Sequence, residues 1–313
     1  MEKTLQKIAN LLIINLQNIN SLGLLDGKMG VAIFLYYYAR YSSQPVYNDQ
    51  SDDLLDELFA ALKEAIPNSL INGAAGIGFG LNYLIKNRFI ETDENPDELF
   101  KEIDVRLPQD IGKQMISDMR SIFPVFSAGF YALSRIEVGK RTNQKNKLII
   151  SLLEIIYKFY NTRKEQKILP AFTNSVIYFL LIVYGHGIYP TKTKKTLMAV
   201  LSLVGDSMQS VKYNLMDIEL LKSLLSSIPF DSKWIDIILD SINQKNLSSD
   251  NDSEIDVIPK NLQLFALYPN LDYPHISKIA EEKYIDDQIN DSFFPDLPLL
   301  AYLGLAMMNV KLC

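Results

Sequence analysis

The sequence predicts an all-α protein built from about seven helix pairs. Apolar residues recur three and four positions apart along much of the chain, as in Leu5, Ile8 and Leu12, and this spacing is typical of one face of an α-helix. Short alternating runs and Asn-Gly hairpin turns, which would indicate strands, are scarce. Helices with a single apolar face alternate with helices that are apolar nearly all round.

The amphipathic helices come first in each pair. Leu54 and Leu58 mark the apolar stripe of the second one, which we expect to begin at the polar segment NDQSDD. A helix of this kind packs through its stripe and leaves its other face in water. We expect amphipathic helices near residues 3–20, 51–66, 97–119, 144–161, 191–208, 232–245 and 275–290.

The second helix of each pair is apolar on nearly every face. A helix of this kind must be covered on all sides, so the alternation predicts an inner ring of helices wrapped by an outer ring. Gly27 and Gly73 are 46 residues apart, Gly76 and Gly129 are 53 apart, and Gly129 and Ser175 are 46 apart. A period in this range is typical of helix-pair repeats. An open solenoid has the same period and stays the alternative. We expect apolar helices near residues 28–41, 74–87, 124–137, 170–184, 214–228, 259–268 and 296–310.

Two similar glycine phrases precede the first two apolar helices. LLDGKMGVAIFLYYYARY carries Gly27-x-x-Gly30, and NSLINGAAGIGFGLNYLIKN carries Gly73-x-x-Gly76. Glycine permits close approach of two backbones and a positive φ where a chain turns. In a ring of hairpins the amino termini of all inner helices meet at one mouth, which their exposed N–H groups make mildly electropositive. We therefore expect the glycines to serve the architecture of this mouth.

The two phrases together resemble the opening repeats of the lanthionine synthetase C-like family. The resemblance is strongest over residues 21–90, and beyond residue 180 it rests on helix count and spacing. It implies a double-ringed α/α toroid that forms a single domain over residues 1–313. Members of the family cyclise peptides by adding Cys thiols onto dehydrated Ser and Thr residues.

The zinc site that the resemblance implies is not reproduced. In the family a Trp-Cys-Tyr-Gly motif and a Cys-His-Gly motif hold zinc, which favours the thiolate form of the substrate. Here Val211-Lys212-Tyr213-Asn214 stands in place of the first motif, and KNLQLFALYPN offers no Cys-His pair. The chain has one cysteine, Cys313, and a two-cysteine site needs two. We expect no metal and no other cofactor.

The sequence does not indicate any other catalytic arrangement. The two histidines are His186, expected at the carboxyl end of the fourth apolar helix, and His275, expected at an amphipathic helix start. Catalytic zinc usually takes three protein ligands. The Gly-x-Ser-x-Gly and phosphate-loop motifs are absent. No aspartate pair for glycoside hydrolysis stands out.

The candidate ligand-binding residues are those expected at the mouth of the ring. We expect the ammonium of Lys212 to occupy the neighbourhood of the family's metal and to pair with a carboxylate such as Asp217 or Asp26. The full set is Asp26, Lys28, Asn72, Thr173, Asn174, Lys212, Tyr213 and Asn214.

Composition limits the partners. The formal net charge of −6 gives a nucleic-acid partner no electrostatic support. The longest apolar run, residues 176–184, is too short for a bilayer, which needs roughly 20 residues. Charged residues interrupt the apolar amino terminus, so we do not expect a signal peptide. A single cysteine indicates a cytoplasmic protein.

Three classes of function remain. The first is a catalytically degenerate lanthionine synthetase C-like protein that uses the mouth of the ring to hold a peptide or a peptide-modifying enzyme, as a scaffold in ribosomal-peptide maturation. The second is an enzyme, hydrolase or cyclase, that uses the central cavity without a metal. The third is a structural or regulatory partner that binds through its outer surface. An open mouth favours the first two, and a mouth filled by large side chains favours the third.

Overall fold

The computed structural model describes residues 2–91, 96–111, 122–138, 143–162, 170–207, 215–246, 289 and 297–312. Every regular element within these ranges is a helix, and none of them is a strand, which confirms the all-α class. The chain divides into two compact units. Unit 1 comprises Met1–Lys113, Phe130–Arg141 and Gln263–Cys313, and unit 2 comprises Gln114–Gly129 and Thr142–Leu262.

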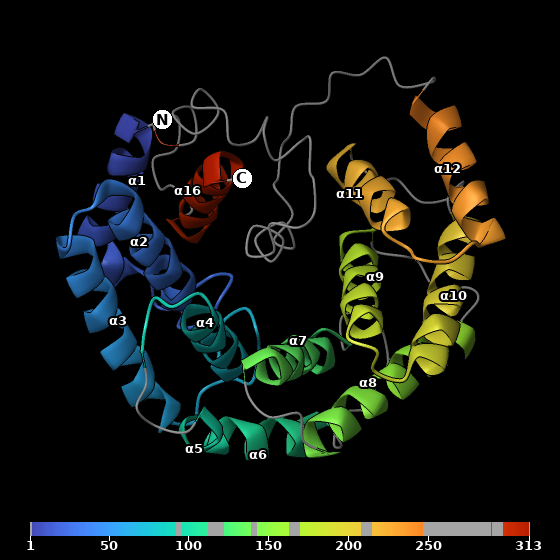
Figure 1. Ribbon diagram of the computed structural model, residues 1–313, viewed down its shortest axis with the longest axis horizontal. Coiled ribbons are helices and arrows are strands. Elements are labelled where there is room, and N and C mark those ends of the chain that lie inside the picture. Colours follow the sequence, from blue (N-terminus) through green and yellow to red (C-terminus); the bar gives the residue numbers. More distant parts are fainter. Residues whose placement is uncertain are drawn as a thin grey trace. The chain divides into compact units, whose positions relative to one another are not determined.

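In unit 1 the apolar helix α2 (Lys28–Ser42) is surrounded by other helices (Figure 1). It packs on α1, α3, α4 and α16, and it is buried along nearly its whole length, as expected for a helix without a polar face. The other elements of unit 1 are α1 (Glu2–Ile14), the short 3-10 helix η1 (Leu16–Asn18), α3 (Val46–Leu62), α4 (Ala74–Lys86), α5 (Pro96–Leu99), α6 (Lys101–Ile111), the later part of α7 (Ile122–Val138) and α16 (Leu297–Leu312).

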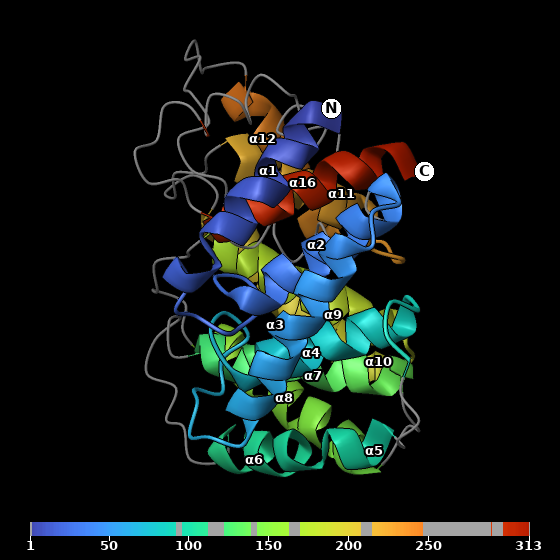
Figure 2. The ribbon, with the colours of Figure 1, turned by 90° about the vertical axis from the view of Figure 1, so that its left-hand side faces the viewer.

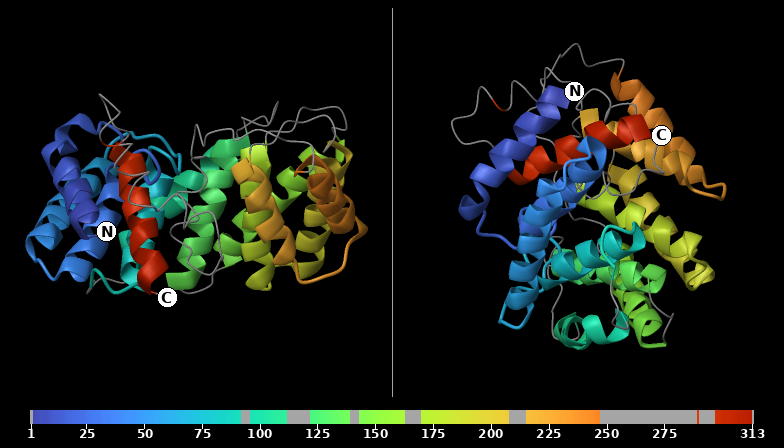
Figure 3. Two further views of the ribbon diagram at one scale, coloured as in Figure 1. Left: turned by 90° about the horizontal axis from the view of Figure 1, so that it is seen from above. Right: turned by 60° about the vertical axis from the view of Figure 1, so that its left-hand side comes forward.

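The last described helix lies against the first two. Figures 1, 2 and 3 all show α16 beside α1 and α2. Close approach is possible because Gly304 of α16 has no side chain: a Cβ there would lie 2.3 Å from the ring of Phe34 in α2. Segments at opposite ends of the sequence therefore form one core.

Glycines inside α4 admit large side chains in the same way. A Cβ on Gly78 would lie 2.4 Å from the ring of Tyr131 in α7, and one on Gly80 would lie 2.4 Å from the side chain of Met29 in α2. A protein interior is close-packed, so these glycines leave the space that the neighbouring side chains fill. The apolar helices of unit 1 thus interlock through glycine positions.

A buried arginine fastens α7 to the amphipathic helices beside it. The side chain of Arg135 is fully buried, and its guanidinium donates to Asp97 at 2.8 Å and to Asp104 at 3.1 Å. The Tyr131 hydroxyl donates to Asp104 at 2.8 Å, and the Arg135 guanidinium also lies 4.5 Å from the centre of the Phe100 ring. The charge of Arg135 is therefore paired twice within unit 1.

Unit 2 repeats the pairing of amphipathic and apolar helices. Helix α10 (Pro190–Ser207) packs on α8 (Asn143–Thr162), α9 (Pro170–Gly185) and α12 (Lys233–Asn246), and α11 (Leu215–Ser226) packs on α9 and α12. The early part of α7 also belongs to this unit. A Cβ on Gly129 of α7 would lie 2.7 Å from the ring of Phe179 in α9.

Most predicted helix positions agree closely with the structure, but three helices differ from it. The helix expected at 97–119 is divided into α5 and α6 and is described only to Ile111. Two others differ at their boundaries. Helix α3 begins at Val46 rather than at residue 51, so NDQSDD lies inside the helix. Tyr47 and Ser51 are buried, and the Ser51 hydroxyl donates to the Tyr47 carbonyl, so packing extends the helix toward Pro45. Helix α1 ends at Ile14 and is followed by η1, short of the expected residue 20. The expected helix at 259–268 lies outside the described residues, as does the one at 275–290 apart from residue 289.

None of the described helices combines the length and the apolar composition needed to cross a membrane.

Candidate functional site

The two glycine phrases pair with each other at equivalent positions. The Leu24 N–H donates to the Leu70 carbonyl at 3.0 Å, and the Leu25 N–H donates to the Ile71 carbonyl at 3.2 Å. Members of each pair are 46 residues apart, as are Tyr37 and Tyr83, whose hydroxyls lie 2.7 Å apart. The repeat in the sequence is therefore a structural repeat, and its two copies touch.

The glycines of the phrases are required because backbone fills the space of a side chain. A Cβ on Gly73 would lie 1.9 Å from the Pro67 carbonyl oxygen, and one on Gly76 would lie 2.2 Å from the Leu70 carbonyl oxygen. The close approach expected from the sequence is confirmed. The expected positive φ is wrong, because Gly27 and Gly73 have φ of −142° and −150°, extended values open to any residue.

Backbone N–H groups at the amino termini of α2 and α4 donate hydrogen bonds to other backbone segments of the protein. The N–H groups of Lys28 and Met29 donate to the carbonyls of Ser21 and Leu22 at 3.0 and 3.3 Å. In the second phrase the Ala74 N–H donates to the Pro67 carbonyl at 2.8 Å. The expectation of exposed N–H groups at these two helix starts is therefore wrong, because the preceding loop folds back over each terminus and satisfies donors that helix starts leave unpaired.

The candidate residues of unit 1 differ strongly in exposure. Lys28 is 8% exposed and forms an ion pair of 2.5 Å with Glu57 of α3. Asp26 is half-buried and Asn72 is exposed. Lys28 therefore holds α2 against α3, and of the three side chains Asn72 is the most open to solvent.

A tyrosine from α16 fills the space beside the first phrase. Tyr302 is fully buried, and its hydroxyl donates to the Leu24 carbonyl at 2.5 Å. Burial, and to a lesser degree the charge of Asp26, raises the pKa of the Tyr302 hydroxyl well above its usual value. A Cβ on Gly30 would lie 2.7 Å from the same hydroxyl. A large, uncharged side chain therefore packs against the first glycine phrase, beside the start of α2.

The remaining candidates belong to unit 2 or lie outside the described residues. Thr173 and Asn174, in the first two turns of α9, are each about 1% exposed, so they contribute to the interior of unit 2. The expected mouth residues Lys212, Tyr213 and Asn214 lie outside the described residues, as does the expected pairing of Lys212 with a carboxylate.

Within the described ranges no three His, Cys, Asp or Glu side chains gather closely enough to hold a metal ion. His186 follows α9, and its N–H donates to the Ile182 carbonyl at 3.0 Å, so its backbone lies at the carboxyl end expected from the sequence. His275 and Cys313 lie outside these ranges.

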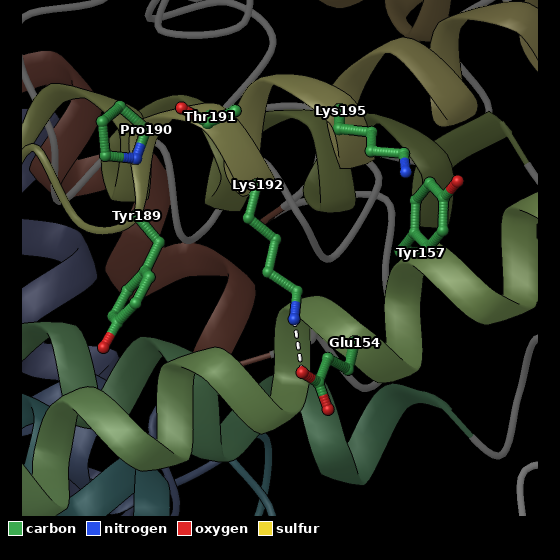
Figure 4. Close-up of a pocket in the computed structure, with 7 residues that line it drawn as sticks. All are labelled: Glu154, Tyr157, Tyr189, Pro190, Thr191, Lys192 and Lys195. Atoms are coloured by element: carbon green, nitrogen blue, oxygen red, sulfur yellow. Dashed lines mark hydrogen bonds and ion pairs between the residues drawn. The ribbon is translucent and has the colours of Figure 1, made fainter.

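A pocket of about 620 Å³ opens between α8 and α10 in unit 2 (Figure 4). Sequence reasoning did not identify it. The signal that marks it is the segment PTKTKKT, a run of lysines placed at a helix start. Its lining residues are Glu154, Tyr157, Tyr189, Pro190, Thr191, Lys192 and Lys195.

Two lysines of the pocket reach from α10 to partners on α8. Figure 4 shows Lys192 paired with the Glu154 carboxylate and Lys195 beside the Tyr157 ring. The Lys195 ammonium lies 4.9 Å from the centre of that ring. An ammonium over an aromatic face is attracted to the ring, but it keeps its full charge. The pocket therefore combines an excess of positive charge with aromatic surface.

Comparison of the chain with family models, with curated proteins and with solved structures finds no match.

Proposed function

We propose that the chain is a catalytically degenerate lanthionine synthetase C-like protein, and that its helix pairs close into an α/α toroid. In this proposal it binds a peptide, or a peptide-modifying enzyme, as a scaffold in ribosomal-peptide maturation. The observation that carries it is the pair of glycine phrases, which resemble that family and which contact each other at equivalent positions, Leu24 with Leu70 and Leu25 with Ile71.

Closure of the ring is supported by the packing of α16 on α1 and α2 in unit 1. An open solenoid keeps its terminal repeats apart, since each repeat contacts only its neighbours. Here Tyr302 and Leu24, 278 residues apart, share a hydrogen bond.

The degenerate character is supported by the sequence at the place of the expected zinc ligands. One cysteine in the chain does not provide the two thiolates that the family's site uses. Without a zinc-bound thiolate a peptide Cys stays mostly a thiol at neutral pH, since its ordinary pKa is about 8.5. Retention of a peptide is then the function that the fold supports without that chemistry.

The test separates binding from cyclisation. A fluorescein-labelled peptide that carries one Cys and one dehydroalanine is titrated with the protein, and its fluorescence anisotropy is followed. Ring formation consumes the thiol without changing the mass of the peptide, so free thiol is measured by alkylation. We expect saturable binding with no loss of thiol beyond the rate in buffer. Faster thiol loss with the protein would show an enzyme, and no saturable binding of this or any charge variant of the peptide would refute the scaffold.

A further inference from the structure

The start of α10 carries an unusual arrangement of charge. Lys192, Lys194 and Lys195 all lie within its first two turns, and its first turn contains no acidic residue. The amino end of a helix bears partial positive charge, so lysine there is unfavourable. Sequences usually agree with such local rules, and departures from them concentrate at functional sites.

The fold neutralises only part of this charge. Lys192 pairs with Glu154, whereas Lys194 and Lys195 lie over the rings of Phe230 and Tyr157 at 4.4 and 4.9 Å. Aromatic rings attract an ammonium without cancelling its charge. The start of α10 therefore stays positive in a chain whose formal net charge is −6.

An exposed aromatic residue borders the same pocket. Tyr189 is 49% exposed, and its φ of 46° lies in the left-handed region that tyrosine rarely adopts. The turn that holds it also contains Gly187 with a φ of 64°. Beside Tyr189, Pro190 begins α10 and contributes apolar surface to the pocket. Tyrosines are enriched at protein-binding surfaces.

We propose that the pocket between α8 and α10 binds an acidic segment of a partner protein. A carboxylate of the segment pairs with Lys195, and an apolar side chain beside it lies against Tyr189 and Pro190. A pocket of about 620 Å³ has the size of typical small-ligand sites, so it holds one or two side chains. This inference rests on the proposed peptide-binding function and assigns that function a surface and a charge preference.

The occupant is a protein segment rather than a nucleic acid for an electrostatic reason. Nucleic-acid binders neutralise a row of phosphates with an extended basic surface. Here the pocket contributes only Lys192 and Lys195, and it also contains Glu154. A short segment with a few carboxylates matches this charge, whereas a polyphosphate chain brings further negative charges toward an acidic protein.

The test measures the affinity for three labelled probes. They are a short Asp/Glu-rich peptide with one Leu and one Phe, its copy with Asn/Gln in place of Asp/Glu, and a single-stranded oligothymidine of similar length. We expect saturable binding of the acidic peptide that weakens with salt and binding of the amide copy that is at least several-fold weaker. Equal binding of the amide copy, or tighter binding of the oligothymidine, would overturn the proposal.

Substitutions locate the binding surface. Lys195→Glu should weaken the acidic peptide about tenfold through loss of one attraction and gain of one repulsion, whereas Lys195→Arg should keep the affinity. Lys233→Glu is the matched control, because Lys233 also begins an amphipathic helix of unit 2 and lies 5.1 Å from the ring of Trp234, outside the pocket. Circular dichroism verifies that each variant keeps its helix content.

The outcomes separate this inference from the function it rests on. If the peptide binds saturably but Lys195→Glu leaves its affinity unchanged, the pocket is not the binding site. The same follows if Lys233→Glu weakens the affinity equally. In both cases the scaffold function stands. If no peptide of any charge binds at millimolar concentration, both the pocket as a binding site and the scaffold function are refuted.

Discussion

Replacement of Tyr302 by Phe tests the contact between α16 and the first glycine phrase. The substitution removes the hydroxyl that donates to the Leu24 carbonyl at 2.5 Å and leaves the ring in place. A buried acceptor that loses its donor costs about 1–3 kcal/mol. We therefore expect Tyr302→Phe to lower the free energy of unfolding by about 1–3 kcal/mol near neutral pH.

The same substitution carries a pH signature whose sign follows from the raised pKa of Tyr302. In the unfolded chain a tyrosine ionises near pH 10, whereas the folded state keeps Tyr302 neutral. Its stabilising effect is complete below pH 10 and is lost as the pH rises toward the folded pKa. By about pH 11 the wild type loses about 1.4 kcal/mol that the variant does not lose. The difference between the two proteins should shrink by that amount.

The assay is guanidinium unfolding followed by circular dichroism at about pH 8 and about pH 11. The other buried tyrosines are common to both proteins and cancel in the difference, so the comparison isolates Tyr302. Tyr189→Phe, at a half-exposed position, is the control and should stay within about 0.5 kcal/mol of the wild type near neutral pH. A difference for Tyr302→Phe that does not change between the two pH values would refute a buried neutral Tyr302.

Three further predictions concern the glycines, the buried arginine and zinc. Gly73→Ala should destabilise by about 1–3 kcal/mol because backbone must move, whereas Gly185→Ala, where a Cβ meets no atom within 4 Å, should be neutral or stabilising; equal losses in thermal unfolding would contradict the steric reason. Arg135→Met should cost about 2–3 kcal/mol, less than breaking a fully buried pair, because Asp97 and Asp104 are 37% and 24% exposed; a variant as stable as the wild type in denaturant would contradict this. Purified, untagged protein should carry far less than one equivalent of zinc by elemental mass spectrometry, and stoichiometric zinc that survives dialysis would show ligands beyond those that one cysteine provides.

The helices could be predicted from the sequence because helix formation follows local periodicity. Apolar spacing placed α2, α4 and α9 to within about one residue of their observed ends, since each of these helices is apolar on nearly every face and starts at a glycine or a proline. Prediction failed where packing decided the boundary. Helix α3 extends to Val46 because Tyr47 and Ser51 are buried against other helices. The polar residues around them do not reveal this burial.

The candidate site shows the same division. The sequence singled out Gly27 and Gly73, but the reason for glycine there is the carbonyl of another segment rather than a positive φ. Lys28 was expected at the mouth of the ring as a candidate ligand-binding residue, yet it is buried in an ion pair with Glu57. Side-chain exposure depends on neighbours that are distant in sequence, so residue type and position did not determine it.

The sequence by itself determined the helical class, the order of amphipathic and apolar helices, the 46-residue repeat and the lack of a second cysteine, because each is a property of local spacing or of composition. Only the tertiary structure decided that Tyr302 packs beside Leu24 and that Lys195 and Tyr157 line one pocket with Glu154. These contacts join segments whose spacing along the chain carries no information on their mutual register. That register is set by close packing of side chains, which excludes most arrangements by steric overlap.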